Sequence, residues 1–150
     1  MAFKFSLEAL LRVRERMFEL AKMEFAKLIN RKKEIEKELE LARSSLKEEA
    51  DKLKREMEVG IMSSDFNLRI QLIASMEQKI RELDGRLKEV EVDLLKAKED
   101  LKQKHIDYEL VKKLKDSQLK KYLKEVNAKL QKELDELVSI KHARLRGGIK

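Results

Sequence analysis

The chain has no proline and only 4 glycines among its 150 residues, so it can connect very few secondary-structure elements. Average proteins contain about 5% proline and about 7% glycine. Charged side chains make up 43% of the sequence, and the hydrophobic residues, 42%, recur at regular spacing. This combination argues against a compact α/β enzyme, a β-sandwich or a disordered chain. It predicts long helices that form a coiled coil.

One segment, residues 59–65, has the features of a break between two helices. Gly60 can adopt the left-handed conformation that ends a helix, and Ser63 or Ser64 can cap the next helix, with Asp65 in its first turn. We therefore predict a single coiled-coil domain made of a helix over 6–59, a turn over 60–63, a helix over 64–145 and a short tail over 146–150.

Apolar residues repeat every seven positions on both sides of this break, as they do along a coiled-coil seam. The first predicted helix carries two adjacent lines: Leu11, Phe18, Phe25, Lys32, Leu39, Leu46 and Leu53, and Leu7, Arg14, Ala21, Leu28, Ile35 and Ala42. The second carries Phe66, Ile73, Ile80, Leu87, Leu94, Leu101 and Tyr108, and Met76, Leu83, Val90, Ala97 and Val111.

Two helices joined by a tight turn cover such stripes most simply by folding back on each other. The predicted fold is all-α: two long helices form an antiparallel coiled-coil hairpin, and the second helix is longer. Pairing outward from the turn sets Leu39 near Leu83 and Leu11 near Lys112. A parallel dimer of unbent helices is the alternative architecture.

Because the second predicted helix is longer, it should extend past the first from about Ser117. Its apolar stripe continues there as Leu119, Leu123, Val126, Leu130, Leu137 and Ile140. Nothing else in the chain is left to cover this stripe, and the apolar residues Phe3, Phe5, Leu7 and Leu10 lie at the same end. An uncovered apolar stripe predicts contact with a partner. A frayed end, or association of two copies, is the alternative.

The excess positive charge of the chain, +7, lies at the same end. Residues 112–150 hold 12 Lys and Arg against 5 Asp and Glu, whereas residues 1–111 hold 24 of each. Clustered lysines bind nucleic acid through counterion release alone. A structural coiled-coil module whose basic C-terminal end binds nucleic acid or another polyanion is therefore the alternative function.

The sequence offers no set of residues for catalysis. It has no cysteine, and His105 and His142 stand far apart without partners for acid–base or metal chemistry. We expect no enzyme activity, no cofactor, no metal and no small-molecule ligand. No apolar run approaches the ~18 residues of a membrane span, and Lys4 and Glu8 interrupt the apolar start of the chain. We therefore expect a soluble, intracellular protein.

A second contact surface is predicted near the turn. Met57, Met62 and Met76 gather there with Phe66, and Leu68 and Leu72 fall off the heptad lines. Apolar residues that a helix hairpin does not use for its own seam are available to a partner.

Three short motifs resemble the flagellar export protein family FliJ. Phe5-Ser6-Leu7-Glu8-Ala9-Leu10-Leu11-Arg12-Val13-Arg14 is similar to the opening of that family. Gly60-Ile61-Met62-Ser63 followed by Phe66 is similar to its turn, and Glu133-Leu134-Asp135-Glu136 to its closing acidic motif. The length, the single turn and the longer second helix also match, so the resemblance covers essentially the whole chain.

The resemblance implies a component of the flagellar type III export apparatus that resembles the γ axle of rotary ATPases. Members bind the FliI ATPase hexamer through their joined ends and the FlhA export gate nearer the turn, and they are linked to export chaperones. It also implies a cytoplasmic location, peripheral at the inner face of the membrane through the export apparatus. A central stalk in another rotary or secretion ATPase would fit the same sequence.

Site residues follow from the resemblance and from the uncovered stripe. The ATPase-binding residues would be Phe5, Leu7, Leu10, Leu11, Arg14, Leu119, Leu123, Val126, Leu130, Leu134, Asp135 and Glu136. The gate-binding residues would be Leu72 and Met76. Opposite these two, Ser45 and Glu49 replace aromatic residues that some members of the family carry.

Overall fold

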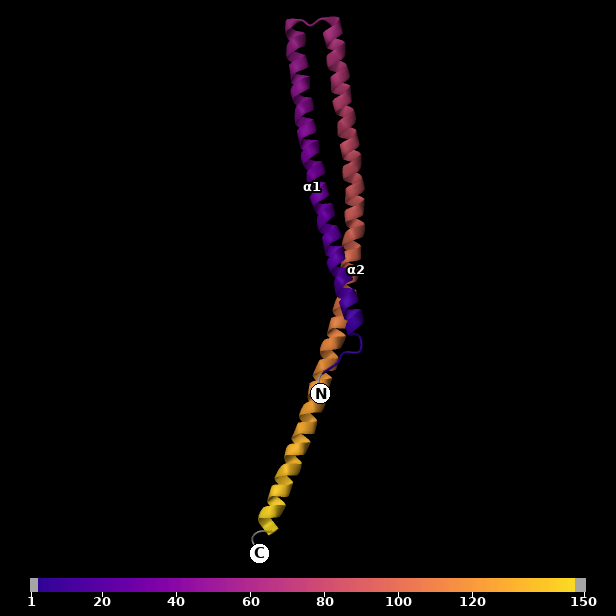
Figure 1. Ribbon diagram of the computed structural model, residues 1–150. Helices are drawn as coiled ribbons and strands as arrows, with labels where there is room; N and C mark the ends of the chain where they lie inside the picture. The colour runs from indigo at the N-terminus through magenta and orange to yellow at the C-terminus, as the bar shows by residue number, and fades with distance from the viewer. Residues whose placement is uncertain (1–2, 148–150) are drawn as a thin grey trace. The chain divides into compact units, whose positions relative to one another are not determined.

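A computed structural model describes residues 3–147 of the chain and shows two long helices, α1 (Glu8–Val59) and α2 (Ser63–Gly147) (Figure 1). They pack against each other in opposite directions, and α2, with 85 residues, is longer than α1, with 52. The described residues form no strand. The predicted fold class is therefore confirmed. The predicted tail reaches residues 148–150, which lie outside the described residues.

The ends of α1 are set by local hydrogen bonds. Residues 6–7 form a turn before the helix, and the Glu8 amide donates to the Phe5 carbonyl at 3.2 Å, so α1 begins two residues later than expected. At its other end Gly60 has a φ of 106°, and its amide donates to the Glu56 carbonyl at 2.9 Å. This left-handed residue closes the last helical turn, as the sequence predicts.

The turn is short, and α2 begins at Ser63. The Phe66 amide donates to the Met62 carbonyl at 2.9 Å, which places the capping position on Met62 instead of on the predicted serines. Asp65 lies in the first turn of α2 as expected. A carboxylate in this position lies near the positive end of the helix dipole.

The chain divides into two compact units, each built from one part of α1 and one part of α2. We call Glu19–Gln103 the turn unit, because it contains the connection between the helices. We call the described part of Met1–Phe18 and Lys104–Lys150 the terminal unit.

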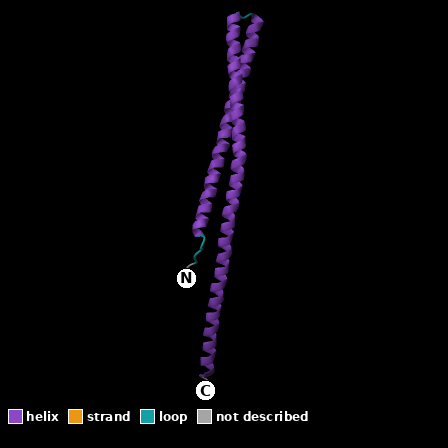
Figure 2. Cartoon of the chain, turned by 90° about the vertical axis from the view of Figure 1, so that its right-hand side faces the viewer, coloured by secondary structure: helices purple, strands orange, loops and turns teal. Residues whose placement is uncertain are grey.

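In the turn unit the two helices leave the loop that joins them and run next to each other (Figures 1 and 2). Its buried residues all belong to the predicted heptad lines: Ala21, Ile35, Leu39, Leu53, Leu83 and Val90. The side chain of Lys32, which occupies one apolar heptad position, reaches 3.9 Å from the Glu91 carboxylate on α2. Its aliphatic stem can lie along the seam while its ammonium stays in water.

In the terminal unit the start of α1 packs on α2 through charged and aromatic side chains. Arg14 Nη1 donates to Asp107 Oδ2 at 3.2 Å. The ring of Phe18 lies 4.9 Å from that of His105 and 5.7 Å from that of Tyr108. His105, although exposed, therefore contributes an aromatic contact.

Residues 3–7, which we call the N-terminal strap, precede α1 and lie outside any helix. Phe5 is 7% exposed, and the ring of Phe3 lies 5.3 Å from that of Tyr122. A non-helical backbone advances up to ~3.3 Å per residue, against ~1.5 Å in a helix, so a short strap reaches far along α2.

The strap corrects the expected start of the uncovered stripe. Ser117 was expected to begin it, but Leu119, Tyr122 and Val126 are half-buried. From Asn127 to the end of α2 at Gly147 every residue is exposed. The uncovered part of α2 therefore begins about ten residues later than a helix-on-helix pairing predicts, because the strap adds cover that a helical count leaves out.

Candidate functional site

The described residues carry no arrangement for metal chemistry and no segment for membrane crossing. Within residues 3–147 no group of three or more His, Cys, Asp or Glu side chains could hold a metal ion. Neither helix, over the part of the chain that is described, is long and apolar enough to cross a membrane. The candidate sites are instead surfaces where large apolar side chains face solvent.

The first surface lies in the terminal unit, and the structure divides the twelve residues expected there into two sets. Six are buried or half-buried within the unit: Phe5, Leu7, Leu11, Arg14, Leu119 and Val126. Six are exposed: Leu10, Leu123, Leu130, Leu134, Asp135 and Glu136. The residues of the first set pack within the terminal unit, and those of the second set face solvent. Arg14, for example, is held by its bond to Asp107.

Sequence reasoning missed two residues of this surface, Val138 and Leu145. Both are exposed, as are the predicted stripe residues Leu137 and Ile140. Leu134, Val138 and Leu145 are spaced by four and seven, so they share one face of α2. The sequence contains this spacing, but Val138 and Leu145 lie outside the seven-residue lines by which the stripe was predicted. We call the exposed apolar residues of this region the terminal surface: Leu123, Leu130, Leu134, Leu137, Val138, Ile140 and Leu145.

The second surface lies at the turn. Val59 is 90% exposed, and Met57, Met62, Leu68 and Leu72 are also exposed. Leu68 and Leu72 therefore face solvent, as their place off the heptad lines predicts. We call these five residues the turn surface. All of them except Met57 line an open hollow of about 740 Å³, together with Arg55, Glu56, Gly60, Ile61, Asp65 and Arg69.

Of the two predicted gate-binding residues, Leu72 is exposed and Met76 is half-buried. Met76 lines a smaller hollow of about 320 Å³, which Leu41, Ala42 and Ser45 of α1 also line. Ala42 and Ser45 are small, which leaves room for this open hollow between α1 and α2. The two predicted residues thus lie on different hollows of the turn unit.

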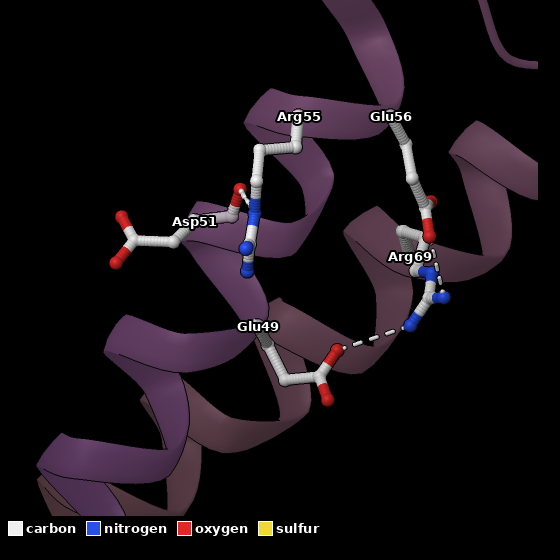
Figure 3. A network of polar contacts seen from close by, with 5 residues as sticks. All are labelled: Glu49, Asp51, Arg55, Glu56 and Arg69. Carbon is white, nitrogen blue, oxygen red and sulfur yellow. Dashed lines mark hydrogen bonds and ion pairs between the residues drawn. The ribbon is translucent and has the colours of Figure 1, made fainter. Parts of the chain in front are cut away.

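Arg69 fixes α2 against α1 beside the turn surface (Figure 3). Its Nη1 donates to Glu49 Oε2 at 3.1 Å, and its Nη2 donates to Glu56 Oε1 at 2.9 Å. One guanidinium therefore spans two carboxylates placed seven residues apart on α1. Glu49, at a position compared with the FliJ family in the sequence, is one of the two carboxylates in this bridge.

Arg55, which also lies near the turn, directs its Nε to the backbone carbonyl of Asp51 at 3.4 Å (Figure 3). Sequence analysis missed the bridge, although the spacing of Glu49 and Glu56 places both on the face that α2 covers.

The protein family described as flagellar FliJ protein matches residues 3–147. The chain belongs to the FliJ family. Membership associates it with flagellar type III export as a coiled-coil component. Comparison with curated protein sequences gave no significant match.

One solved structure similar to this chain is that of a putative YscO homologue, CT670, from Chlamydia trachomatis. The two are 17% identical, and the alignment covers 94% of this chain and 96% of that one, with a TM-score of 0.48.

In this FliJ-family chain the three motifs take different structural roles. The opening motif supplies the buried Phe5 and Leu11, so much of it is packed inside the terminal unit. The turn motif contains the left-handed Gly60. The closing motif, residues 133–136, is wholly exposed. Of the three, the closing motif is the one whose whole length is available to a partner.

Proposed function

We propose that the chain is an adaptor, without catalytic activity of its own, that binds a FliI-type ATPase hexamer through its terminal surface. The observation that carries this proposal is the end of α2, where every residue from Asn127 to Gly147 is exposed. Apolar side chains alternate there with Lys141, Arg144 and Arg146. Apolar residues held in water on a folded segment provide binding free energy when a partner covers them.

Binding would act on the ATPase by mass action. A segment that binds an assembled ring more tightly than free subunits stabilises the ring in proportion to that difference in affinity. A single helix inside a ring also contacts some subunits and not others, so it favours different conformations in them. This arrangement would resemble the γ axle of rotary ATPases.

The turn surface is proposed to contact an FlhA-type export gate protein. Leu68 and Leu72 provide exposed apolar area one helical turn apart on α2. Met76 would contribute through the hollow beside Ser45. With both surfaces occupied, one chain would connect the ATPase to the gate from the cytoplasm, at the inner face of the membrane. Export chaperones are a further proposed class of partner.

The ATPase contact can be tested with a double variant, Leu123→Ser with Leu130→Ser. Both residues are exposed, so helical content should be unchanged while the apolar area offered to the ring falls. We expect the wild-type chain to raise ATPase activity and hexamer content of FliI from the same source, and the variant to do so much less. The measurements are phosphate release and light scattering.

Leu41→Ser in the turn unit is the matched control, because Leu41 is also an exposed leucine on a helix. It should leave the ATPase effect intact. The proposal fails if saturating wild-type chain changes neither ATPase activity nor hexamer content. A large drop in melting temperature of the double variant would instead assign Leu123 and Leu130 to the packing of the terminal unit.

Polyanion binding is the second candidate function, and the charge of the same end favours it. Among residues 112–147, Lys and Arg outnumber Asp and Glu by 11 to 5. Binding to nucleic acid would weaken steeply as salt is raised. Affinity for a labelled DNA or RNA fragment, measured over a salt series, separates this function from an ATPase contact that rests on apolar side chains.

A further inference from the structure

The end of α2 combines full exposure with a broad apolar face. Six large apolar side chains between Asn127 and Gly147 are 51% to 62% exposed: Leu130, Leu134, Leu137, Val138, Ile140 and Leu145. Their spacings of three, four and seven residues bring them to one side of the helix. This side resembles half of a coiled-coil interface about three heptads long.

Charges are ordered along the same segment. Its first half, residues 127–136, carries one net negative charge, from Lys129, Lys132, Glu133, Asp135 and Glu136. Its second half, residues 137–147, carries three positive charges, Lys141, Arg144 and Arg146, and no acidic residue. The sign of the charge therefore changes near Leu137.

We propose that residues 127–147 form a docking surface for a second copy of this chain, with the two segments antiparallel and crossing near Leu137. In this orientation the acidic half of each copy faces the basic half of the other. A parallel pair would instead set three cations against three cations, and like charges across an interface disfavour a complex. The apolar faces bury each other in the antiparallel pair.

The dimer is weak and depends on concentration, because about three heptads bury little area compared with a standard interface. It also covers most of the terminal surface. A chain paired in this way does not offer that surface to another protein, so a tighter-binding partner shifts the equilibrium towards monomer.

A charge-exchange experiment on the full chain tests the proposal. Variant A carries Glu133→Lys, Asp135→Lys and Glu136→Lys, and variant B carries Lys141→Glu, Arg144→Glu and Arg146→Glu. In variant A both halves of the segment carry net positive charge, and in variant B both carry net negative charge. Each variant therefore repels its own copies, whereas A and B attract each other. All six positions are exposed, and Lys and Glu are good helix formers, so helicity should be retained.

Sedimentation equilibrium over a wide concentration range gives the readout. We expect wild type to approach twice the monomer mass, A and B alone to remain monomeric, and their equimolar mixture to regain the dimer. A wild-type chain that stays monomeric at its highest soluble concentration overturns the proposal. Variants that dimerise alone, or a mixture that stays monomeric, overturn the antiparallel arrangement.

Engineered cysteines test the orientation separately, and the chain has no cysteine of its own to interfere. In the antiparallel pair Leu137 lies beside its own copy, so Leu137→Cys should form a covalent dimer on oxidation. Two copies of Leu130 would lie about 20 Å apart, which is beyond disulfide reach, so Leu130→Cys should remain monomeric. Ser139→Cys, on the opposite face, is the background control.

Efficient crosslinking of Leu130→Cys would reveal a parallel pair and overturn the proposal. Sedimentation and crosslinking both use the chain alone. A missing ATPase interaction would therefore leave dimerisation intact, and a monomeric chain would leave ATPase binding intact, so the two ideas fail independently.

Discussion

Lys115 on α2 and Glu8 at the start of α1 form an ion pair, with 2.9 Å between Nζ and Oε2. Together with the bond from Arg14 to Asp107, it sets the register of α1 against α2 in the terminal unit. The pair also marks the end of helix-on-helix packing. Beyond it the strap reaches Tyr122 of α2 through the ring of Phe3, and every residue of α2 from Asn127 onward is exposed.

Truncating a seam residue of the turn unit should destabilise the protein strongly. Leu83 is 2% exposed, so Leu83→Ala leaves a cavity and should lower the free energy of unfolding by about 2–4 kcal/mol. Urea unfolding followed by circular dichroism measures this change. Leu95→Ala is the control, because Leu95 is 67% exposed, and it should cost under about 0.5 kcal/mol. If both variants lost the same free energy of unfolding, Leu83 would not be a buried residue of the seam.

Two glycines should respond to alanine in opposite directions. Gly60 has a φ of 106°, so Gly60→Ala should cost about 1 kcal/mol through backbone strain. Gly85 lies inside α2, and an added Cβ there meets no atom within 4 Å, so Gly85→Ala should stabilise by up to about 1 kcal/mol. Thermal unfolding of both variants checks the signs. Stabilisation by Gly60→Ala would contradict the turn geometry.

Arg69 should stabilise the turn unit in a salt-dependent way. Arg69→Met removes both ion pairs and should cost about 1 kcal/mol at low salt, since the side chains concerned are partly exposed, and less at high salt. Arg69→Lys keeps the charge but lacks the guanidinium fork that spans Glu49 and Glu56, so it should recover part of the loss. A loss for Arg69→Met that does not change with salt would indicate packing by the arginine stem instead.

The strap should be released by removing its buried ring. Phe5→Ala should speed hydrogen exchange at the Glu8 amide, which donates to the Phe5 carbonyl, because the turn loses its anchor. Amides of the turn unit, such as that of Leu39, should exchange as before. Leu10→Ala is the control at an exposed neighbour. Unchanged exchange at Glu8 in Phe5→Ala would show that the strap is held by other contacts.

Most of the fold follows from local patterns in the sequence. The heptad lines predict which residues turn inward: all buried residues of the turn unit lie on them, and even Lys32 and Arg14, which are charged, occupy half-buried positions on these lines. Gly60 predicts the turn because few other residues adopt a positive φ without strain. The apolar stripe after Ser117 predicts an uncovered segment of α2, although with the wrong start.

The candidate surfaces were harder to predict, because exposure depends on what other segments cover. Sequence reasoning treated Phe5 and Leu130 alike, as apolar residues near one end, yet one is buried and the other is exposed. The bridge from Arg69 to Glu49 and Glu56 joins residues 20 and 13 positions apart and is set by how the helices are rotated about their axes.

The sequence by itself determined two helices, one turn and an antiparallel seam, because helical periodicity and glycine conformation act over a few neighbouring residues. The tertiary structure alone decided where the cover of α2 ends and its exposed segment begins. That boundary depends on a strap of residues 3–7 that follows no periodicity and reaches Tyr122 through an aromatic contact more than a hundred residues along the chain. Such a contact leaves no local pattern, since it depends on the path of the chain before α1.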